Sequence, residues 1–130
     1  VLAIEENPHG TSDAKNNLKL NDFSENQVQL INSKVESILE DFDQKLPQWA
    51  KKPEVIIANP PRKGLDTKAL EWFLENGKNT KFQLIYISCN ITSLTRDLEQ
   101  LTASGYTLRT LEAFDMFAHT DKLEWLAVLD

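Results

Sequence analysis

The stretch that decides the fold of this chain is VIIANPPRKGLD, residues 55–66. Its first four residues are apolar and favour β-structure, which is typical of a strand covered by helices on both faces. Two prolines then end the strand, and Asp66 can cap a helix that presents Leu70, Phe73 and Leu74 on one side. A buried strand, a tight turn and an amphipathic helix form the repeating unit of a parallel α/β sheet.

The same alternation extends along the chain in both directions. Apolar runs that predict strands lie at residues 1–4, 28–31, 55–58, 84–87 and 123–129. The first four runs alternate with stretches of helical period, so we expect βαβ units, a mostly parallel sheet and central strands at 55–58 and 84–87. Residues 106–114 and 123–129 predict two strands joined by a loop at 115–122, and this last pair should be antiparallel.

Two further helices have recognisable start signals. Ser33 and Glu36 form a capping box, which predicts a helix over 33–46 that ends at Pro47. Thr92 or Ser93 can cap another helix, whose apolar stripe faces the sheet and which ends before a glycine. The members of that stripe are Leu94, Leu98 and Leu101.

Composition and charge limit the class of protein. The chain has 130 residues, of which 41% are hydrophobic and 26% charged, as expected for a single domain around one core. No apolar run approaches the roughly 20 residues that cross a bilayer, and no signal peptide is evident, so we expect a soluble cytoplasmic protein without a membrane partner. The net charge of -6 has the wrong sign for a broad nucleic-acid-binding surface. Any contact with a polyanion should therefore be local.

The single cysteine, Cys89, excludes an internal disulfide and a zinc module, and we expect no metal site. The chain opens at Val1 directly into an apolar run, and its only methionine is Met116. We therefore expect these residues to be a fragment of a longer protein.

Polar residues that follow the predicted strands are candidates for a site, because open α/β sheets bind ligands at the carboxyl ends of their strands. Asn59 can turn its amide toward a ligand, and Arg62 is a planar cation suited to phosphate. Cys89 follows the next buried strand, near a helix N-terminus that favours a thiolate. The simpler alternatives are a rigid turn with a solvated Arg-Lys pair and a small buried cysteine.

Two carboxylates also lie at strand ends. Glu124 begins an apolar strand between Leu123 and Trp125, where desolvation favours a general base that works near neutrality. Glu5 closes the first strand, where a carboxylate can accept hydrogen bonds from ribose hydroxyls. An edge-strand glutamate that points to water is the alternative for Glu124.

Three segments together resemble the S-adenosylmethionine-dependent RNA 5-methyluridine methyltransferases. They are NPPRKGLD at 59–66, YISCN at 86–90 and FDMFAHT at 114–120, each at a predicted strand end, with Glu124 just after the third. The resemblance implies a class I methyltransferase fold, Rossmann-like, with a mostly parallel sheet and an antiparallel C-terminal pair. Residues 1–130 would then be the C-terminal part of the catalytic domain, acting on tRNA or rRNA with S-adenosylmethionine as cofactor.

The resemblance also implies roles for single residues. Cys89 matches the nucleophile that adds to C6 of uracil, and Glu124 matches the base that removes the C5 proton. Glu5 and Asn59 match cofactor-binding residues, and Arg62 matches the motif arginine beside the substrate. We expect Asn59, Cys89 and Glu124 to line one cleft at a single edge of the sheet.

The chain departs from the family pattern at several points. Asn59 stands where the family has aspartate, and Ala118 replaces a proline. The first strand of the family and its glycine-rich cofactor loop would precede Val1. We expect residues 1–4 to pair directly with 55–58, to exchange a strand with a second copy as in a dimer, or to be completed by a longer chain.

Two other functions remain open from the sequence. One is methylation of an exocyclic base amine, because Asn-Pro-Pro also resembles the motif of base-amino methyltransferases, which need no cysteine nucleophile. The other is an inactive truncated module that keeps the fold without binding cofactor. We expect activity in the full-length parent and none in the isolated 130 residues.

Overall fold

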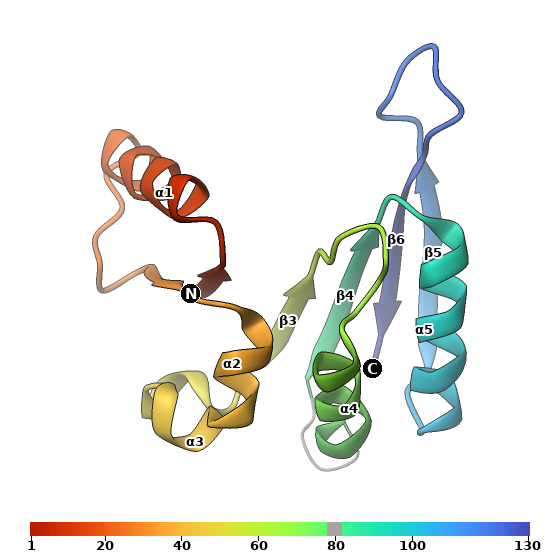
Figure 1. Ribbon diagram of the computed structural model, residues 1–130, viewed down its shortest axis with the longest axis horizontal. Coiled ribbons are helices and arrows are strands. Elements are labelled where there is room, and N and C mark those ends of the chain that lie inside the picture. Colours follow the sequence, from red (N-terminus) through yellow and green to blue (C-terminus); the bar gives the residue numbers. More distant parts are fainter. Residues whose placement is uncertain (78–81) are drawn as a thin grey trace. The chain divides into compact units, whose positions relative to one another are not determined.

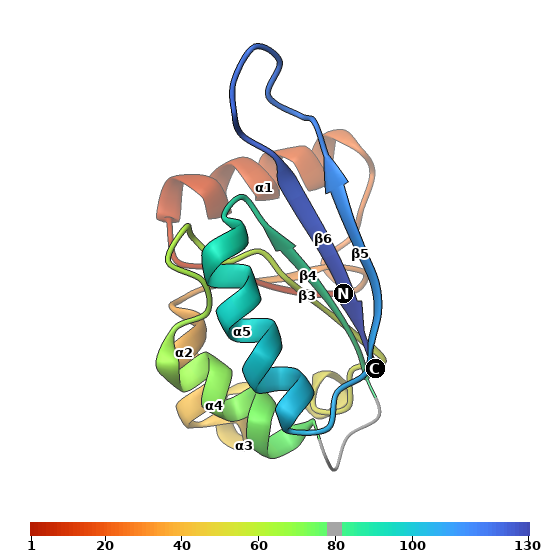
Figure 2. The same ribbon diagram turned by 90° about the vertical axis from the view of Figure 1, so that its right-hand side faces the viewer.

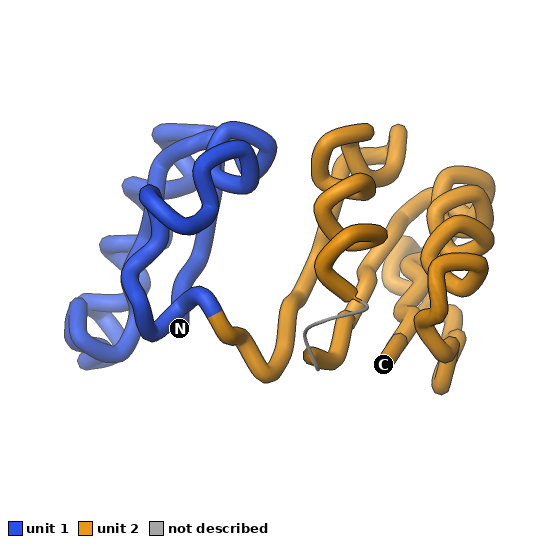
Figure 3. Tube along the Cα trace, turned by 90° about the horizontal axis from the view of Figure 1, so that it is seen from below, with its two compact units in different colours: residues 1–51 blue, residues 52–130 orange. Residues whose placement is uncertain are grey.

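The chain forms two compact units, unit 1 at Val1–Lys51 and unit 2 at Lys52–Asp130 (Figure 3). A computed structural model describes residues 1–77 and 82–130. Each unit has its own apolar cluster, one around Ile38 and the other around Leu84. The expectation of one core is therefore wrong, because the described strands of each unit pair only with one another and each half buries its own apolar stripe.

Unit 1 begins with a strand, a helix and a second strand that is parallel to the first. These elements are β1 (Leu2–Glu5), α1 (Pro8–Leu20) and β2 (Gln29–Asn32) (Figure 1). The helix starts at Asn7, whose side chain accepts hydrogen bonds from the amides of His9 and Gly10, while Pro8 occupies the first helical position. The structure thus confirms the first predicted βαβ unit.

The helix predicted over 33–46 is broken. It forms α2 (Val35–Glu40) and α3 (Phe42–Lys45), followed by a short 3-10 helix at Gln48–Ala50. The capping box does not form, because Lys34 and not Ser33 occupies the N-cap position of α2; the Ser33 hydroxyl donates to the Lys34 carbonyl. Non-helical backbone at Asp41 separates the two pieces, so Ile38 and Leu46 enter one cluster from different directions.

Unit 2 contains a four-stranded sheet. Its strands are β3 (Val55–Ala58), β4 (Gln83–Ser88), β5 (Leu108–Phe114) and β6 (Glu124–Leu129), in the order β3-β4-β6-β5. β3 and β4 are parallel, whereas β6 is antiparallel to both of its neighbours. All these strands lie within two residues of the predicted ranges. The α/β class and the antiparallel C-terminal pair are therefore confirmed.

Two helices cover one face of this sheet, α4 (Thr67–Asn76) and α5 (Ile91–Ala103) (Figure 2). Asp66 caps α4 as predicted, because its side chain accepts from the Lys68 amide. The predicted cap of α5 at Thr92 or Ser93 is wrong: Asn90 caps the helix and accepts from both of their amides. An asparagine with extended backbone just before the first turn satisfies two amides that the later hydroxyls cannot reach.

One face of β3 is exposed, although the sequence predicts that helices cover both faces. Val55 is 49% exposed and Ile57 is 65% exposed, whereas Leu84 and Tyr86 on β4 are fully buried. Both helices of unit 2 pack on the face that carries Leu84 and Tyr86. The continuous apolar character of residues 55–58 therefore does not correspond to burial on both faces in this chain.

The strands β1 and β3, whose pairing with each other is one of the arrangements expected from the sequence, each have one strand partner among the described residues. Among the described residues β1 pairs only with β2, and β3 pairs only with β4. The three arrangements expected for residues 1–4 stay predictions. No helix in the described parts of the chain is long and apolar enough to cross a membrane.

Tyr106 gives unit 2 a pH-dependent stability. Its hydroxyl donates to the Phe73 carbonyl at 3.0 Å, and burial raises its pKa to about 12. Above pH 10 the unfolded chain loses this proton while the folded chain keeps it, so stability should fall by on the order of 2 kcal/mol toward pH 12. We expect Tyr106→Phe to remove this part of the alkaline loss in thermal unfolding followed from pH 8 to 11. An unchanged slope in the variant would contradict the assignment.

Candidate functional site

The parallel pairing of β3 and β4 brings two candidate residues to the same end of the sheet in unit 2, the end where these strands finish. Ala58 lies beside Tyr86 in this parallel pair. Asn59 directly follows β3, and Cys89 directly follows β4. Both therefore lie at the carboxyl ends of neighbouring strands, which is where ligands bind in open α/β sheets.

Glu124, the first residue of β6, lies at the same end of the sheet, because β6 runs antiparallel to β4. Ser88, the last residue of β4, lies opposite Trp125, so Cys89 and Glu124 are the residues that directly adjoin this last pair. Cys89 just after β4 and Glu124 at the start of β6 thus lie at the same end of the sheet, where β4 ends and β6 begins (Figure 1). That these groups line a single cleft stays a prediction.

Cys89 is held in a tight turn between β4 and α5. The Ser88 hydroxyl donates to the Asn90 carbonyl at 3.1 Å, and the Asn90 amide donates back to that hydroxyl at 3.1 Å. Asn90 also caps α5, so the partly buried thiol lies just before the positive end of a helix. This turn fixes the backbone on both sides of the thiol.

Glu124 supplies an acceptor without a partner. Within the described part of the chain its Oε2 atom is buried and accepts no hydrogen bond. A buried polar atom without a hydrogen-bond partner lowers the stability of the fold by about 1–3 kcal/mol. Such an atom usually binds a ligand or a water molecule, or has a catalytic role. Because it lies at the same end of the sheet as Cys89, Glu124 is a candidate for a group that accepts a proton from a bound substrate.

The loop between β3 and α4 is folded tightly. The Gly64 amide donates to the Pro61 carbonyl at 2.9 Å, and Gly64 adopts a φ of 86°. A side chain at this position would meet Asp97, because a Cβ atom would lie 2.6 Å from its Oδ2. Only glycine fits this conformation and this approach. The exposed side chain of Arg62 lies within the same loop.

Asp97 is a residue that the sequence analysis missed. It lies on α5 with no exposed surface, and its carboxylate accepts from the Tyr86 hydroxyl at 2.6 Å and from the Leu65 amide at 2.9 Å. Burial and the bond to Asp97 raise the pKa of Tyr86 well above its ordinary value, so its hydroxyl stays a donor. The available signal was an aspartate next to Leu98 on an otherwise apolar stripe.

Glu5 belongs to unit 1. It ends β1, its side chain is exposed, and its Oε1 accepts from the Asn7 amide at 2.7 Å. Asn7 in turn caps α1, so the carboxylate lies at the start of a helix that directly follows a parallel strand. This is the position at which a strand-end carboxylate can accept hydroxyl donors from a ribose.

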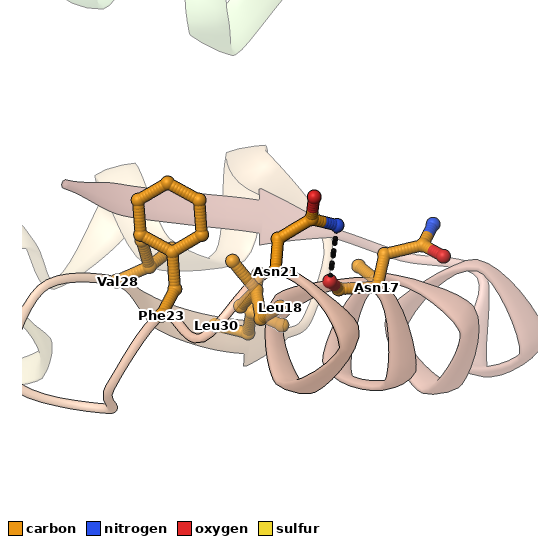
Figure 4. Close-up of a pocket in the computed structure, with 7 residues that line it drawn as sticks. Asn17, Leu18, Asn21, Phe23, Val28 and Leu30 are labelled. Atoms are coloured by element: carbon orange, nitrogen blue, oxygen red, sulfur yellow. Dashed lines mark hydrogen bonds between the residues drawn. The ribbon is translucent and has the colours of Figure 1, made fainter.

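Unit 1 also has a shallow hollow of about 280 Å³ (Figure 4). Its lining consists of apolar side chains and two asparagines, of which Asn21 donates to the Asn17 carbonyl at 2.8 Å. The lining residues are Ala14, Asn17, Leu18, Asn21, Phe23, Val28 and Leu30. These side chains supply no acid, base or nucleophile, so the hollow is not a candidate for catalysis.

Comparison with known proteins identifies the family. The family model described as tRNA (uracil-5-)-methyltransferase matches residues 9–130, which is nearly the whole chain. The chain belongs to this family. The resemblance inferred from the three segments at strand ends is therefore confirmed.

The relatives of this family member include uncharacterized RNA methyltransferases from two bacteria. One, from Halalkalibacterium halodurans, is 33% identical over 133 residues, and the other, from Caldanaerobacter subterraneus subsp. tengcongensis, is 35% identical over 130 residues. Each match covers 100% of this chain and 26% of the relative. The chain thus spans about a quarter of the length of these proteins.

Solved structures support the same fold at low sequence identity. The N-terminal domain of human METTL16 in complex with SAH aligns with a TM-score of 0.67 and 16% identity, over 99% of this chain and 51% of that one. A ribosomal protein L11 methylase from Lactobacillus delbrueckii subsp. bulgaricus aligns with a TM-score of 0.62 and 17% identity, over 98% and 56%. The fold expected for this family member, that of class I methyltransferases, is confirmed.

Proposed function

We propose that this chain is the C-terminal part of a methyltransferase catalytic domain that forms 5-methyluridine in tRNA or rRNA. The observation that supports this most strongly is the pairing of Ser88 with Trp125 between β4 and β6, which brings the residues next to this pair, Cys89 and Glu124, to the same end of the sheet. Uracil has no strong nucleophile at C5, so its methylation needs both a covalent activator and a base. Family membership supports the same reaction.

Cys89 begins the proposed reaction. Its thiolate attacks C6 of the target uracil and forms a carbon–sulfur bond, and the electron pair of the C5–C6 double bond moves toward C5 and the O4 carbonyl. C5 then becomes nucleophilic and takes a methyl group. Cys89 directly precedes Asn90, which caps α5, so the attacking sulfur belongs to the residue just before this helix.

Glu124 completes the proposed reaction. After methyl transfer C5 carries both a methyl group and its original proton, and the carboxylate removes that proton. The released electron pair restores the C5–C6 double bond, and the carbon–sulfur bond breaks to regenerate the thiolate of Cys89. The buried Oε2 without a partner fits this role, because it leaves an acceptor free for the proton.

The donor set fits S-adenosylmethionine as the cofactor. This cofactor supplies the methyl group from its sulfonium centre when it is bound. Glu5 has an exposed carboxylate at the end of β1, which can accept the ribose hydroxyls, and Asn59 offers an amide oxygen at the end of β3. Asn59 is neutral, so its contribution near a sulfonium is a dipole and not a full charge.

Arg62 is proposed to contact the RNA. Its side chain is exposed, and its carbonyl accepts from the Ser93 hydroxyl at 3.0 Å, so its backbone is held while the guanidinium stays available. A planar guanidinium binds phosphate through two parallel hydrogen bonds. A single cation placed at the edge of the sheet can serve an otherwise acidic chain as a local RNA contact.

The product can be tested with RNA that carries tritium at C5 of uridine. The full-length parent protein, given tRNA or rRNA and S-adenosylmethionine, should release tritium to water in proportion to methyl groups transferred. Methylation without tritium release would overturn the proposal and support methylation of an exocyclic base amine. Absence of any methylation of either RNA by the parent protein would also overturn the proposal.

Cofactor binding by the 130-residue chain alone is expected to be weak. Glu5 and Asn59 belong to different compact units, and the described strands of these units form no common sheet. A cofactor held by residues of two compact units must offset the cost of fixing both sets of side chains, so we expect a Kd of about 1 mM or weaker. Calorimetric titration, with the mass measured by light scattering, tests this. Tight binding by a monomer would show that the two residues already form a complete site.

A further inference from the structure

The buried carboxylate of Asp97 takes no part in the proposed reaction, yet it holds the loop that contains Asn59 and Arg62. Each of its oxygens accepts two hydrogen bonds. Oδ2 accepts from Tyr86 and Leu65, and Oδ1 accepts from two nitrogens of Arg96 at 2.6 and 2.8 Å. All four donors converge on one carboxylate, so its charge is compensated although it is fully buried.

The loop is tied to α5 at three successive points. The Ser93 hydroxyl donates to the Arg62 carbonyl at 3.0 Å, Arg96 donates to the Lys63 carbonyl at 3.1 Å, and Asp97 accepts from the Leu65 amide. These contacts link residues more than 30 positions apart in the chain. Figure 2 shows α5 beside the connection between β3 and α4.

The same helix also positions the nucleophile. Cys89 directly precedes Asn90, which caps α5, and the turn around Cys89 is closed by hydrogen bonds to Asn90. The loop after β3 and the turn after β4 are therefore attached to one rigid helix. The buried carboxylate is the innermost of these attachments, and the glycine at position 64 lets the loop approach it.

We infer that Asp97 is a positioning residue that fixes the loop 59–65 relative to Cys89, so that the groups contacting RNA and cofactor meet the nucleophile in one geometry. This inference rests on the proposed function. Displacement of a substrate-positioning group by about 1 Å can lower a rate by roughly 10²-fold. Loss of the anchor should therefore act on the rate even where the protein still folds.

The first experiment measures the anchor without any activity. Amide hydrogen exchange of the segment 59–66 is followed by mass spectrometry in the full-length parent protein. Asp97→Ala should speed exchange of this segment by about 10-fold or more, because Leu65 loses its acceptor. Asp97→Asn keeps one oxygen for Leu65 and should stay close to wild type. Glu99→Gln on the exposed side of α5 is the control. Unchanged exchange in Asp97→Ala would overturn the inference.

The second experiment separates positioning from stability. In Asp97→Ala the Tyr86 hydroxyl is stranded, so adding Tyr86→Phe should recover part of the lost Tm. The rate of covalent adduct formation with RNA in a single turnover should nevertheless stay at least about 10-fold below wild type in both variants, and Asp97→Asn should restore most of it.

These measurements have distinct contrary outcomes. A rate that recovers together with Tm in the double variant would mean that Asp97 is merely structural, which overturns the inference. A wild-type protein that forms no adduct would overturn the proposed function, and the exchange of segment 59–66 would then decide alone whether Asp97 anchors the loop.

Discussion

Replacing Cys89 with alanine in the full-length parent protein is expected to abolish both RNA methylation and the covalent RNA adduct. The thiolate forms the only bond that makes C5 of uracil nucleophilic, and Cys89 is the only cysteine of this chain. Turnover should therefore fall by roughly 10³-fold or more. The measurements are methyl transfer from labelled S-adenosylmethionine and the amount of protein–RNA adduct that survives denaturation.

A matched variant distinguishes loss of chemistry from loss of fold. Thr92→Ala alters an exposed side chain in the first turn of α5, close to Cys89 in sequence. It should leave methylation and adduct formation near wild type. Full turnover by Cys89→Ala would contradict a covalent mechanism and favour the amine-methylating alternative, because transfer to an amine needs no thiol.

The strand ends of unit 2 could be predicted from sequence because the signals are local. Apolar runs define β3 and β4, prolines end the first of them, and Asp66 marks the next helix. Parallel topology then brings the residues after these strands to one edge without knowledge of any side-chain contact. Local signals therefore suffice to predict that Asn59 and Cys89 lie at the carboxyl ends of neighbouring strands.

The features that escaped prediction depend on contacts between distant residues. Asp97 resembles an ordinary helical aspartate until its partner Leu65, which is 32 positions away, is known. The broken helix at 33–46 likewise depends on where Ile38 and Leu46 are buried, which the local capping box cannot reveal. Tertiary burial outweighed local pattern in both cases.

The division into two units also depends on contacts between distant residues, which local sequence patterns do not predict. The strands at 1–4 and 55–58 have similar apolar character, and sequence gives no indication of which neighbours they lack. In the described chain each has one strand partner, and Val55 and Ile57 remain exposed. Pattern alone therefore predicted the strands correctly and overestimated how far they are covered.

Glu124→Gln is expected to separate the two halves of the reaction. Glutamine keeps the shape of the side chain but cannot take the C5 proton, so Cys89 should still attack C6 and C5 should still receive the methyl group. The methylated adduct should then accumulate, because the carbon–sulfur bond cannot break until the proton leaves. Turnover should fall by about 10²–10⁴-fold, the usual contribution of a general base.

The adduct can be followed on a denaturing gel with labelled RNA. Glu112→Gln makes the same chemical change on the neighbouring strand β5, at an exposed position opposite Leu126, and should neither slow turnover nor trap RNA. The double variant Cys89→Ala with Glu124→Gln should form no adduct, which would assign the trapped bond to the thiol. A Glu124→Gln protein that turns over normally would show that another group removes the proton. Loss of the adduct in that single variant would place Glu124 at the earlier step, the attack of Cys89 on C6.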